Sequence, residues 1–125
     1  MIWTLAQVAL GGALGAMGRY MTGVAAVRVM GHGFPWGTLA VNIVGSFLMG
    51  VLVVVLGKKG GTHMAPFLVT GMLGGFTTFS TFSLDVLTIY ERGQVALAVG
   101  YAAASLILSL GAIALALTLT RGAFA

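Results

Sequence analysis

Ten residues in the middle of a long apolar segment combine groups that suit ion chemistry. The stretch GGFTTFSTFS, residues 74–83, holds two glycines, three threonines, two serines and three phenylalanines. Glycine weakens a helix, and a helix broken at membrane depth frees carbonyl oxygens that can bind a cation and N–H groups that favour an anion. Phe76, Phe79 and Phe82 recur at a spacing of three, so the positive edges of their rings could contact a small anion. The stretch predicts either an ion site at a broken helix or a kinked helix with an aromatic packing stripe.

A second group of polar side chains shares one face of the last apolar segment. Tyr101, Ser105 and Ser109 are spaced by four, which places them one above the other on a helix. Asn42, with Thr38 one turn before it, lies in another apolar segment. Polar groups in lipid must be satisfied, and a single hydroxyl usually bonds to its own helix. This set therefore predicts a ladder of neutral donors along a polar path, with back-bonding as the alternative.

Titratable side chains are too few for most catalytic chemistry. The only acids are Asp85 and Glu91, and His32 and His63 fall in expected connections. The chain contains no cysteine, and its His and acidic residues have no zinc-binding spacing. No serine has a His and a carboxylate at a spacing that would activate it. The sequence therefore predicts that the protein is not an enzyme.

The elements that must position these side chains are membrane helices. Of the 125 residues, 59% are hydrophobic and 6% are charged, whereas soluble domains are about 25% charged. Apolar runs such as FLMGVLVVVLG do not alternate as transmembrane strands do. We therefore expect an all-α integral membrane protein with a single domain, 1–125, and a third helix broken near its middle. The four expected spans cover residues 2–27, 37–57, 66–90 and 95–120.

Positive charge is almost balanced between the two ends of the expected spans. Four spans put both termini on one side. The cations are Lys58, Lys59 and Arg121 on that side and, on the other, Arg28, Arg92 and, if it reaches the interface, Arg19. Orientation normally follows an asymmetry of Lys and Arg, so this balance predicts insertion in both directions and an antiparallel dimer. Orientation fixed by another signal is the alternative. Because the six cations are scattered among short connections, we expect no nucleic-acid partner.

Small residues recur four apart along the expected helices. The pairs are Gly11 with Gly15, Ser46 with Gly50, Gly71 with Gly75, and Ser105 with Ser109. This spacing predicts helix backbones that approach each other closely in lipid.

Three motifs together resemble those of one family of membrane proteins. GGFTTFSTFS resembles the signature of the Fluc (CrcB) family of fluoride channels, and N-x-x-G-S-F at residues 42–47 and G-R-Y at residues 18–20 are similar to motifs of that family. Length, four spans and balanced charge agree with the resemblance over the whole chain. The resemblance implies an antiparallel, dual-topology homodimer in the bacterial cytoplasmic membrane. Such a dimer has two pores and lets fluoride leave the cell passively, which relieves fluoride toxicity.

The resemblance also implies roles for individual residues. Backbone carbonyls of Gly74 and Thr77 from both subunits would hold a structural sodium ion at the dimer centre. The side chains expected at the fluoride pore are Asn42, Phe79, Phe82, Ser80 and Thr81. The residues expected along a polar track are Thr38, Tyr101, Ser105 and Ser109. Arg19 would have an electrostatic or structural role, and Asp85 stands where many members are expected to have Glu.

The physical chemistry of fluoride agrees with these expectations. Fluoride is small and strongly hydrated, so a pore must replace its water with several donors without binding so tightly that release stalls. A fixed central cation would raise the local potential for anions. Two alternatives remain. One is a small dual-topology exporter of hydrophobic cations, which needs a buried carboxylate that the first span lacks. The other is a membrane scaffold that transports nothing.

Overall fold

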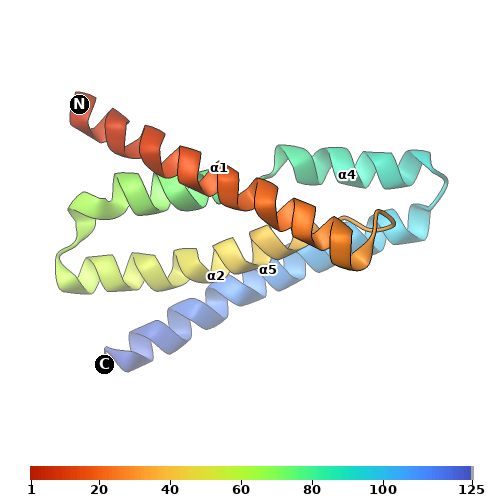
Figure 1. Cartoon of the computed structure of the whole chain (residues 1–125). Coiled ribbons are helices and arrows are strands. Elements are labelled where there is room, and N and C mark those ends of the chain that lie inside the picture. Colours follow the sequence, from red (N-terminus) through yellow and green to blue (C-terminus); the bar gives the residue numbers. More distant parts are fainter. Residues whose placement is uncertain (125) are drawn as a thin grey trace.

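Helices account for nearly all of residues 1–124, which the computed structural model describes (Figure 1). The elements in chain order are α1 (Ile2–Met30), α2 (Trp36–Lys59), the 3₁₀ turn η1 (Thr62–Met64), the π-helical segment η2 (Pro66–Leu73), α3 (Gly74–Phe76), α4 (Ser80–Glu91) and α5 (Val95–Ala123). No strand occurs among these residues. The predicted all-α class is therefore confirmed.

Three helical segments are long and apolar enough to cross a membrane by length and composition. They are Trp36–Lys59, Thr62–Glu91 and Val95–Ala123. The expected first span corresponds to α1, which is 29 residues long but is not among the three in the described part of the chain. Its glycines, together with Gln7 and Arg19, dilute its apolar character. The chain is thus a multi-pass membrane protein.

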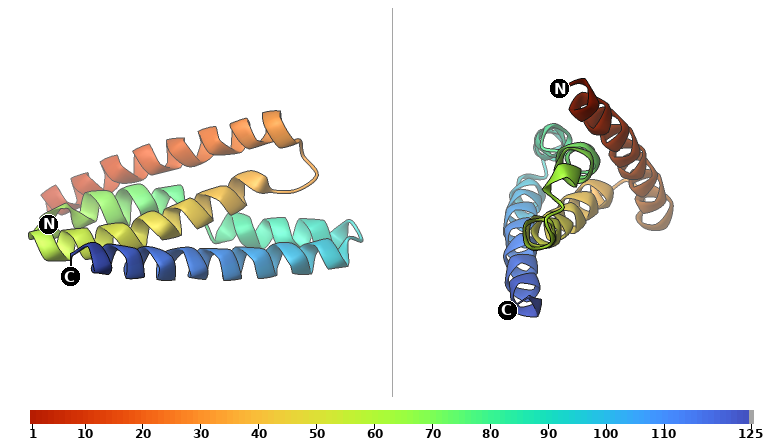
Figure 2. Two further views of the ribbon diagram at one scale, coloured as in Figure 1. Left: turned by 90° about the horizontal axis from the view of Figure 1, so that it is seen from below. Right: turned by 90° about the vertical axis from the view of Figure 1, so that its left-hand side faces the viewer.

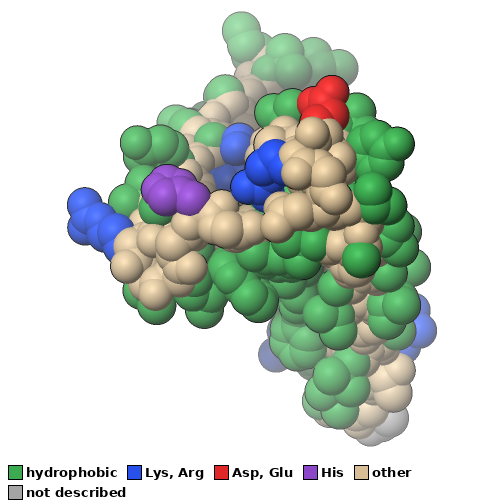
Figure 3. All heavy atoms as spheres, turned by 90° about the vertical axis from the view of Figure 1, so that its right-hand side faces the viewer, with side chains coloured by type: hydrophobic (Ala, Val, Ile, Leu, Met, Phe, Trp, Pro, Cys, Tyr) green, Lys and Arg blue, Asp and Glu red, His purple; other side chains and the backbone are tan. Residues whose placement is uncertain are grey.

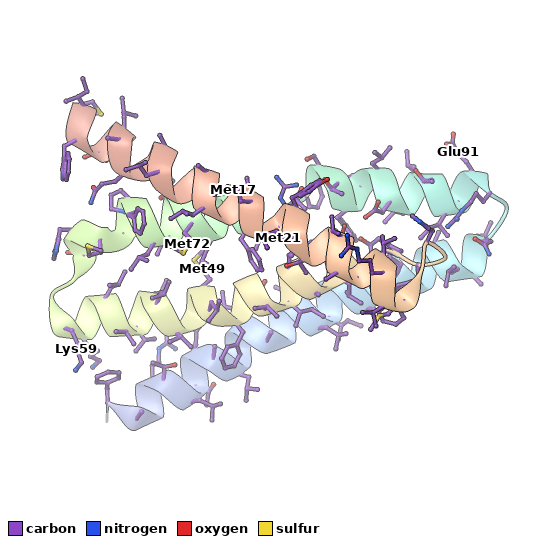
Figure 4. All side chains as sticks on the ribbon, viewed as in Figure 1. Met17, Met21, Met49, Lys59, Met72 and Glu91 are labelled. Atoms are coloured by element: carbon purple, nitrogen blue, oxygen red, sulfur yellow. The ribbon has the colours of Figure 1, made fainter. Side chains whose placement is uncertain are left out.

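Tight turns at glycine place both ends of the chain at one end of the bundle. Gly31, Gly60 and Gly93 have φ of 79°, 70° and 83°, a region that other residues enter at a cost. Both termini lie at the left end in Figure 1, and Figure 2 agrees. At that end the Lys59 Nζ lies 5.7 Å from the centroid of the Phe124 ring, and Figure 4 shows Glu91 at the opposite end. The helices therefore run back and forth with connections at the two ends.

Hydrophobic side chains form both the interior and most of the surface. A buried cluster between α2, α4 and α5 contains Leu39, Phe82, Ile89, Ala98 and Tyr101. Figure 3 looks onto the end opposite the termini, where charged and histidine side chains lie beside polar atoms and hydrophobic side chains cover the flanks. This distribution is what a lipid environment requires.

The third membrane segment is interrupted at residues 77–79, between α3 and α4. The sequence predicted the interruption at glycines followed by two threonines, and the structure places it at those threonines. Gly74 has helical φ and ψ of −61° and −37°, whereas Thr77 is extended with φ −86° and ψ 162°. The glycines before the break instead allow close packing of this segment.

The two halves of the interrupted segment pack against different helices. η2 and α3 lie along α1, whereas α4 lies along α5 (Figure 2). On the α1 side, a Cβ added at Gly71 would come within 2.9 Å of Val8 O, and one at Gly75 within 2.7 Å of Gly12 O. Added Cβ atoms at Gly11 and Gly15 would also meet backbone atoms of η2 and α3. The close approach predicted from these two four-spaced pairs is confirmed.

Candidate functional site

The break begins at Thr77, where the backbone turns away from the helix axis. Both the N–H and the Oγ1 of Thr77 donate to Leu73 O, each at 3.0 Å. The last helical turn is therefore closed by Thr77 itself, and its hydroxyl is engaged in a back-bond of the kind common in helices. The methyl group of Thr77 packs against Gly45 of α2. A Cβ atom added at Gly45 would overlap this methyl group.

Thr78, the central residue of the break, is bonded through its backbone to Asn42 of α2. The Thr78 N–H donates to Asn42 Oδ1 at 2.9 Å, and Asn42 Nδ2 donates to Thr78 O at 3.0 Å. Backbone groups left unpaired at membrane depth are costly. The amide of Asn42 therefore replaces the helical partners that Thr78 lacks.

The side chain of Thr78 supports the start of α4. Its Oγ1 accepts from the Thr81 N–H at 3.2 Å, as an N-cap residue does three positions before the bonded amide. Its Oγ1 also lies 3.4 Å from Ser80 Oγ. Ser80 and Thr81 were expected at the fluoride pore. Here the Ser80 side chain is exposed and the Thr81 backbone is engaged in this cap.

Arg19 of α1 reaches the other side of the break. Its Nε donates to Gly75 O at 3.1 Å. The described residues place no carboxylate in a salt bridge with it, so its guanidinium stabilises a freed carbonyl while keeping its positive charge uncompensated. The electrostatic or structural role expected for Arg19 stays a prediction.

The carbonyl oxygens of Gly74 and Thr77 receive no hydrogen bond from the described residues. In an unbroken helix Gly74 O would accept from Thr78 N–H, which is bonded to Asn42 Oδ1 instead. Thr77 O would accept from Thr81 N–H, which is bonded to Thr78 Oγ1. Carbonyl oxygens without a hydrogen bond are the kind of ligand that a sodium ion prefers. The two residues therefore fit the expected cation site by chemistry.

A cavity of about 310 Å³ lies beside the break, between α2, α4 and α5. The expected site residues that line it are Asn42, Phe79, Phe82, Ser105, Ser109 and, through the break, Thr77. Ser105 is 5% exposed, and the hydroxyls of Ser105 and Ser109 are buried with no hydrogen-bond partner in the described structure. By contrast, the hydroxyls of Thr22, Ser83 and Thr118 bond to the carbonyl four residues earlier. The two serines of α5 thus bring free donors to a cavity that Asn42 and Thr78 also line.

A second cavity, of about 520 Å³, lies between α1 and the start of α2. It is lined by Arg19, Arg28, Thr38 and Thr81, among others, and contains no acidic residue. Thr38, which was expected on the same track as Ser105 and Ser109, lines this second cavity. Thr78 lines both cavities and therefore lies between them.

The three phenylalanines do not form the single stripe that their spacing suggested. Phe79 and Phe82 are paired, with ring centroids 5.6 Å apart. Phe76 lies before the break and contacts the region of Gly18 and Gly45. The helical repeat is interrupted at Thr77, so a spacing of three no longer keeps Phe76 on the face of the other two. Phe79 is 75% exposed and Phe82 is 9% exposed, so one ring faces outward and the other packs inside.

Tyr101, the first member of the four-spaced set on α5, bonds to α4. Its side chain is fully buried, and its hydroxyl donates to Asp85 Oδ2 of α4 at 3.1 Å. Its ring packs against Phe82 at 5.4 Å between centroids and edge-on against Phe34 at 5.3 Å. Of the predicted Tyr-Ser-Ser face, Tyr101 therefore fastens α4 to α5, and Ser105 and Ser109 line the cavity.

Sequence reasoning missed the central position of Thr78 and the supporting role of Gly45. Thr78 stood out only as one of several hydroxyl residues in the third span. Its partner Asn42 is 36 residues away, so no local pattern joins them. The N-x-x-G spacing that connects Asn42 to Gly45 was a usable signal, because it places both on one face of α2. The described residues contain no group of three or more His, Cys, Asp or Glu that could hold a metal ion.

Comparison with known proteins identifies the relatives of this chain. Residues 6–117 match the family described as "CrcB-like protein, Camphor Resistance (CrcB)". A protein of Cereibacter sphaeroides named fluoride-specific ion channel FluC is 61% identical over 122 residues, which cover 98% of each chain. Proteins of the same name are 56% identical in Paracoccus denitrificans, over 98% of each chain, and 52% identical in Agrobacterium fabrum, over 96% of this chain and 98% of the relative.

These matches agree with the motifs at the broken helix, at Asn42 and at Arg19. They extend over nearly the whole chain, and the relatives carry the name of an ion channel and not of an enzyme. The resemblance seen in the sequence is thereby confirmed, and the chain belongs to the CrcB-like protein family.

Proposed function

We propose that this protein is a fluoride-selective channel that lets fluoride leave the cell passively across the cytoplasmic membrane and so relieves its toxicity. The observation that carries the proposal is the cavity beside the break, where the free hydroxyls of Ser105 and Ser109 lie with the amide of Asn42 and the ring of Phe79. The printed name of the relatives, fluoride-specific ion channel, supports it.

The character of the cavity suits a small anion that must also be released. Its polar groups are neutral, and no acidic or basic side chain lines it. Neutral donors and the positive edges of aromatic rings replace part of the hydration shell of fluoride without the tight binding that a buried cation would cause. Larger halides lose less on dehydration, so the advantage of such donors is greatest for fluoride.

Four membrane spans complete the proposal, with α1 as the first. Its 29 residues reach about 43 Å at 1.5 Å per residue, enough to cross a hydrocarbon core of about 30 Å. α1 packs along η2 and α3 through glycines, as helices do in lipid. The polar residues that lower its hydropathy include Arg19, which is engaged at the break.

We propose that the functional unit is an antiparallel, dual-topology homodimer with two pores. The near-balance of Lys and Arg between the two ends of the bundle supports insertion in both directions. The exposed Phe79 ring and the exposed Gly74 supply a surface at the break that a second copy can cover. In such a dimer the carbonyls of Gly74 and Thr77 from both copies are the groups that would hold a central structural sodium ion.

Fluoride efflux from liposomes tests the proposed activity directly. Purified protein is reconstituted into vesicles loaded with equal fluoride and chloride, and each anion is followed with its own electrode after a potassium gradient is released with valinomycin. The expected result is rapid efflux of fluoride while chloride is retained. Fluoride efflux no faster than that of chloride contradicts the proposal.

Single cysteines test dual topology cleanly, because the chain contains no cysteine of its own. Thr62→Cys lies at the end that holds the termini, and Gln94→Cys lies at the opposite end; both positions are exposed. In cells treated with a membrane-impermeant maleimide, each variant is expected to label to about half its full extent. Full labelling of one position and none of the other would show a fixed orientation.

Sodium removal tests the proposed cation site. Unfolding temperature and fluoride efflux are compared in sodium salts and in N-methylglucamine salts after dialysis against a sodium-free buffer. We expect sodium to raise the unfolding temperature, the efflux rate, or both, because a bound ion stabilises the state that holds it. The absence of any difference in either quantity would remove the sodium ion from the proposal.

A further inference from the structure

The break has a feature that the proposed conduction path alone does not require: the side chain of Asn42 is bonded twice to the backbone of one residue. The bonds are Thr78 N–H to Asn42 Oδ1 at 2.9 Å and Asn42 Nδ2 to Thr78 O at 3.0 Å. They link α2 to the third segment across 36 residues of sequence. The Asn42 amide therefore satisfies both backbone groups of Thr78 where the helix supplies no partner.

These two bonds fix the orientation of the Asn42 amide. The oxygen must face the Thr78 N–H and the nitrogen must face the Thr78 carbonyl, so the reversed arrangement would oppose donor to donor and acceptor to acceptor. An amide nitrogen carries two hydrogens, and only one is used on Thr78. Asn42 therefore has one N–H left, and the residue lines the cavity beside the break.

Thr78 stands where changes in its position matter most for a passing ion. It lines both the 310 Å³ cavity with Ser105 and Ser109 and the 520 Å³ cavity with Arg19 and Thr81. Its Oγ1 also accepts from Thr81 N–H and so starts α4. A shift of Thr78 would therefore change the walls of both cavities and the position of the first turn of α4 together.

We infer that Asn42 is a positioning residue that fixes the backbone of Thr78 through these two hydrogen bonds, called the clamp below. The clamp keeps the helix interrupted at Thr78 and determines where Thr78 lies between the two cavities. The effect of Asn42 on transport passes through the backbone of Thr78 and the orientation of its own remaining N–H. The part of the inference that concerns transport rests on the proposed fluoride channel, whereas the clamp itself does not.

Hydrogen–deuterium exchange tests the clamp independently of transport. The variant Asn42→Leu keeps the size of the side chain and removes both bonds. Exchange of the amides in residues 77–81 is expected to rise about tenfold or more, since losing a hydrogen bond at membrane depth corresponds to at least that factor. Exchange in η2 should stay unchanged, which a general loss of stability would not allow. The matched control is Val44→Leu, an exposed position on the same helix, where no change is expected.

Fluoride efflux is measured on the same samples, per folded protein. The inference predicts that Asn42→Leu lowers efflux together with the loss of protection at residues 77–81. Unchanged exchange at these residues overturns the clamp, whether or not efflux falls. If Asn42→Leu does not fold, Asn42→Ser replaces it, because a serine side chain is too short to reach both groups of Thr78. The exchange of residues 77–81 is then expected to rise several-fold. Wild-type protein that shows no preference for fluoride would refute the channel and leave the exchange result to decide the clamp.

Discussion

The two halves of the interrupted membrane segment are held in place by opposite means. Before the break, η2 and α3 pack backbone against backbone on α1, with Gly71 and Gly75 opposite Gly11, Gly12 and Gly15. After the break, α4 is held by side-chain hydrogen bonds, in which the Thr81 N–H donates to Thr78 Oγ1 and the Tyr101 hydroxyl donates to Asp85. Gly71 and Gly75 therefore serve packing, whereas the threonines of the GGFTTFSTFS stretch and their partners make the break.

The difference also separates stability from function. The glycine half contributes few groups to the cavities, whereas the second half supplies Thr78, Phe79, Phe82 and Thr81 to their walls. Substitutions in the first half should therefore act on folding, and substitutions at the cavity should act on transport.

The largest expected effect comes from a side chain added to the glycine half. In Gly15→Val the new side chain meets Met72 O and the Phe76 N–H, which are backbone atoms that cannot move aside. We expect a loss of at least about 3 kcal/mol in the free energy of unfolding, and little folded protein after purification. Size-exclusion chromatography and thermal unfolding in detergent measure it.

Gly111→Ala is the matched control for that substitution, because a Cβ at Gly111 meets nothing within 4 Å. Alanine favours a helix over glycine by about 1 kcal/mol, so this variant should be as stable as the wild type or more stable. A Gly15→Val protein with wild-type stability would show that the backbone contact between α1 and the third segment is unimportant.

Removal of the two free hydroxyls should leave stability unchanged and reduce transport. Ser105→Ala combined with Ser109→Ala deletes donors that have no protein partner, so the free energy of unfolding should not fall. Efflux of fluoride should fall about tenfold or more, because a hydrogen bond to a charged group contributes about 1.5–3 kcal/mol. Thr118→Ala, whose exposed hydroxyl bonds to Ala114 O, is the control. Efflux at the wild-type rate would remove both serines from the path.

The smallest expected effect concerns the fastening of α4 to α5. Tyr101→Phe removes the donor to Asp85 and should lower the free energy of unfolding by about 1–2 kcal/mol, since the carboxylate is left without its partner. The double variant Tyr101→Phe with Asp85→Asn should lose less than the sum of the two single variants. Additive losses in this cycle would indicate that the two side chains do not interact.

Part of this arrangement was predictable from local patterns. Spacing of four residues identified the close approach of Gly71 and Gly75 to α1 and the shared face of Ser105 and Ser109, since helical geometry alone determines both. The interruption of the third helix was also expected. The bonds that hold the break were not, because they come from Asn42 and Arg19 on other helices.

The pairing of helices set the remaining limits of prediction. Tyr101 was assigned to the polar track with the serines because it shares their helix face. Only the contact of α4 with α5 shows that Asp85 accepts a hydrogen bond from the Tyr101 hydroxyl. Phe76 was grouped with Phe79 and Phe82 on the assumption of an unbroken helix between them. Sequence spacing determines what one helix presents, whereas the partner that receives it depends on tertiary packing.

The Phe79→Ile variant shows whether fluoride moves through the cavity beside the break, as we propose. Phe79 is 75% exposed and its ring makes no hydrogen bond, so isoleucine should leave the fold and the proposed dimer intact while removing the aromatic edge from the cavity wall. Fluoride efflux from liposomes is measured for this variant and the wild type at equal protein density, with size-exclusion chromatography as the check on assembly. The account predicts wild-type efflux that is selective for fluoride over chloride and a strong reduction in Phe79→Ile. Unchanged fluoride efflux in a correctly assembled Phe79→Ile protein would contradict it.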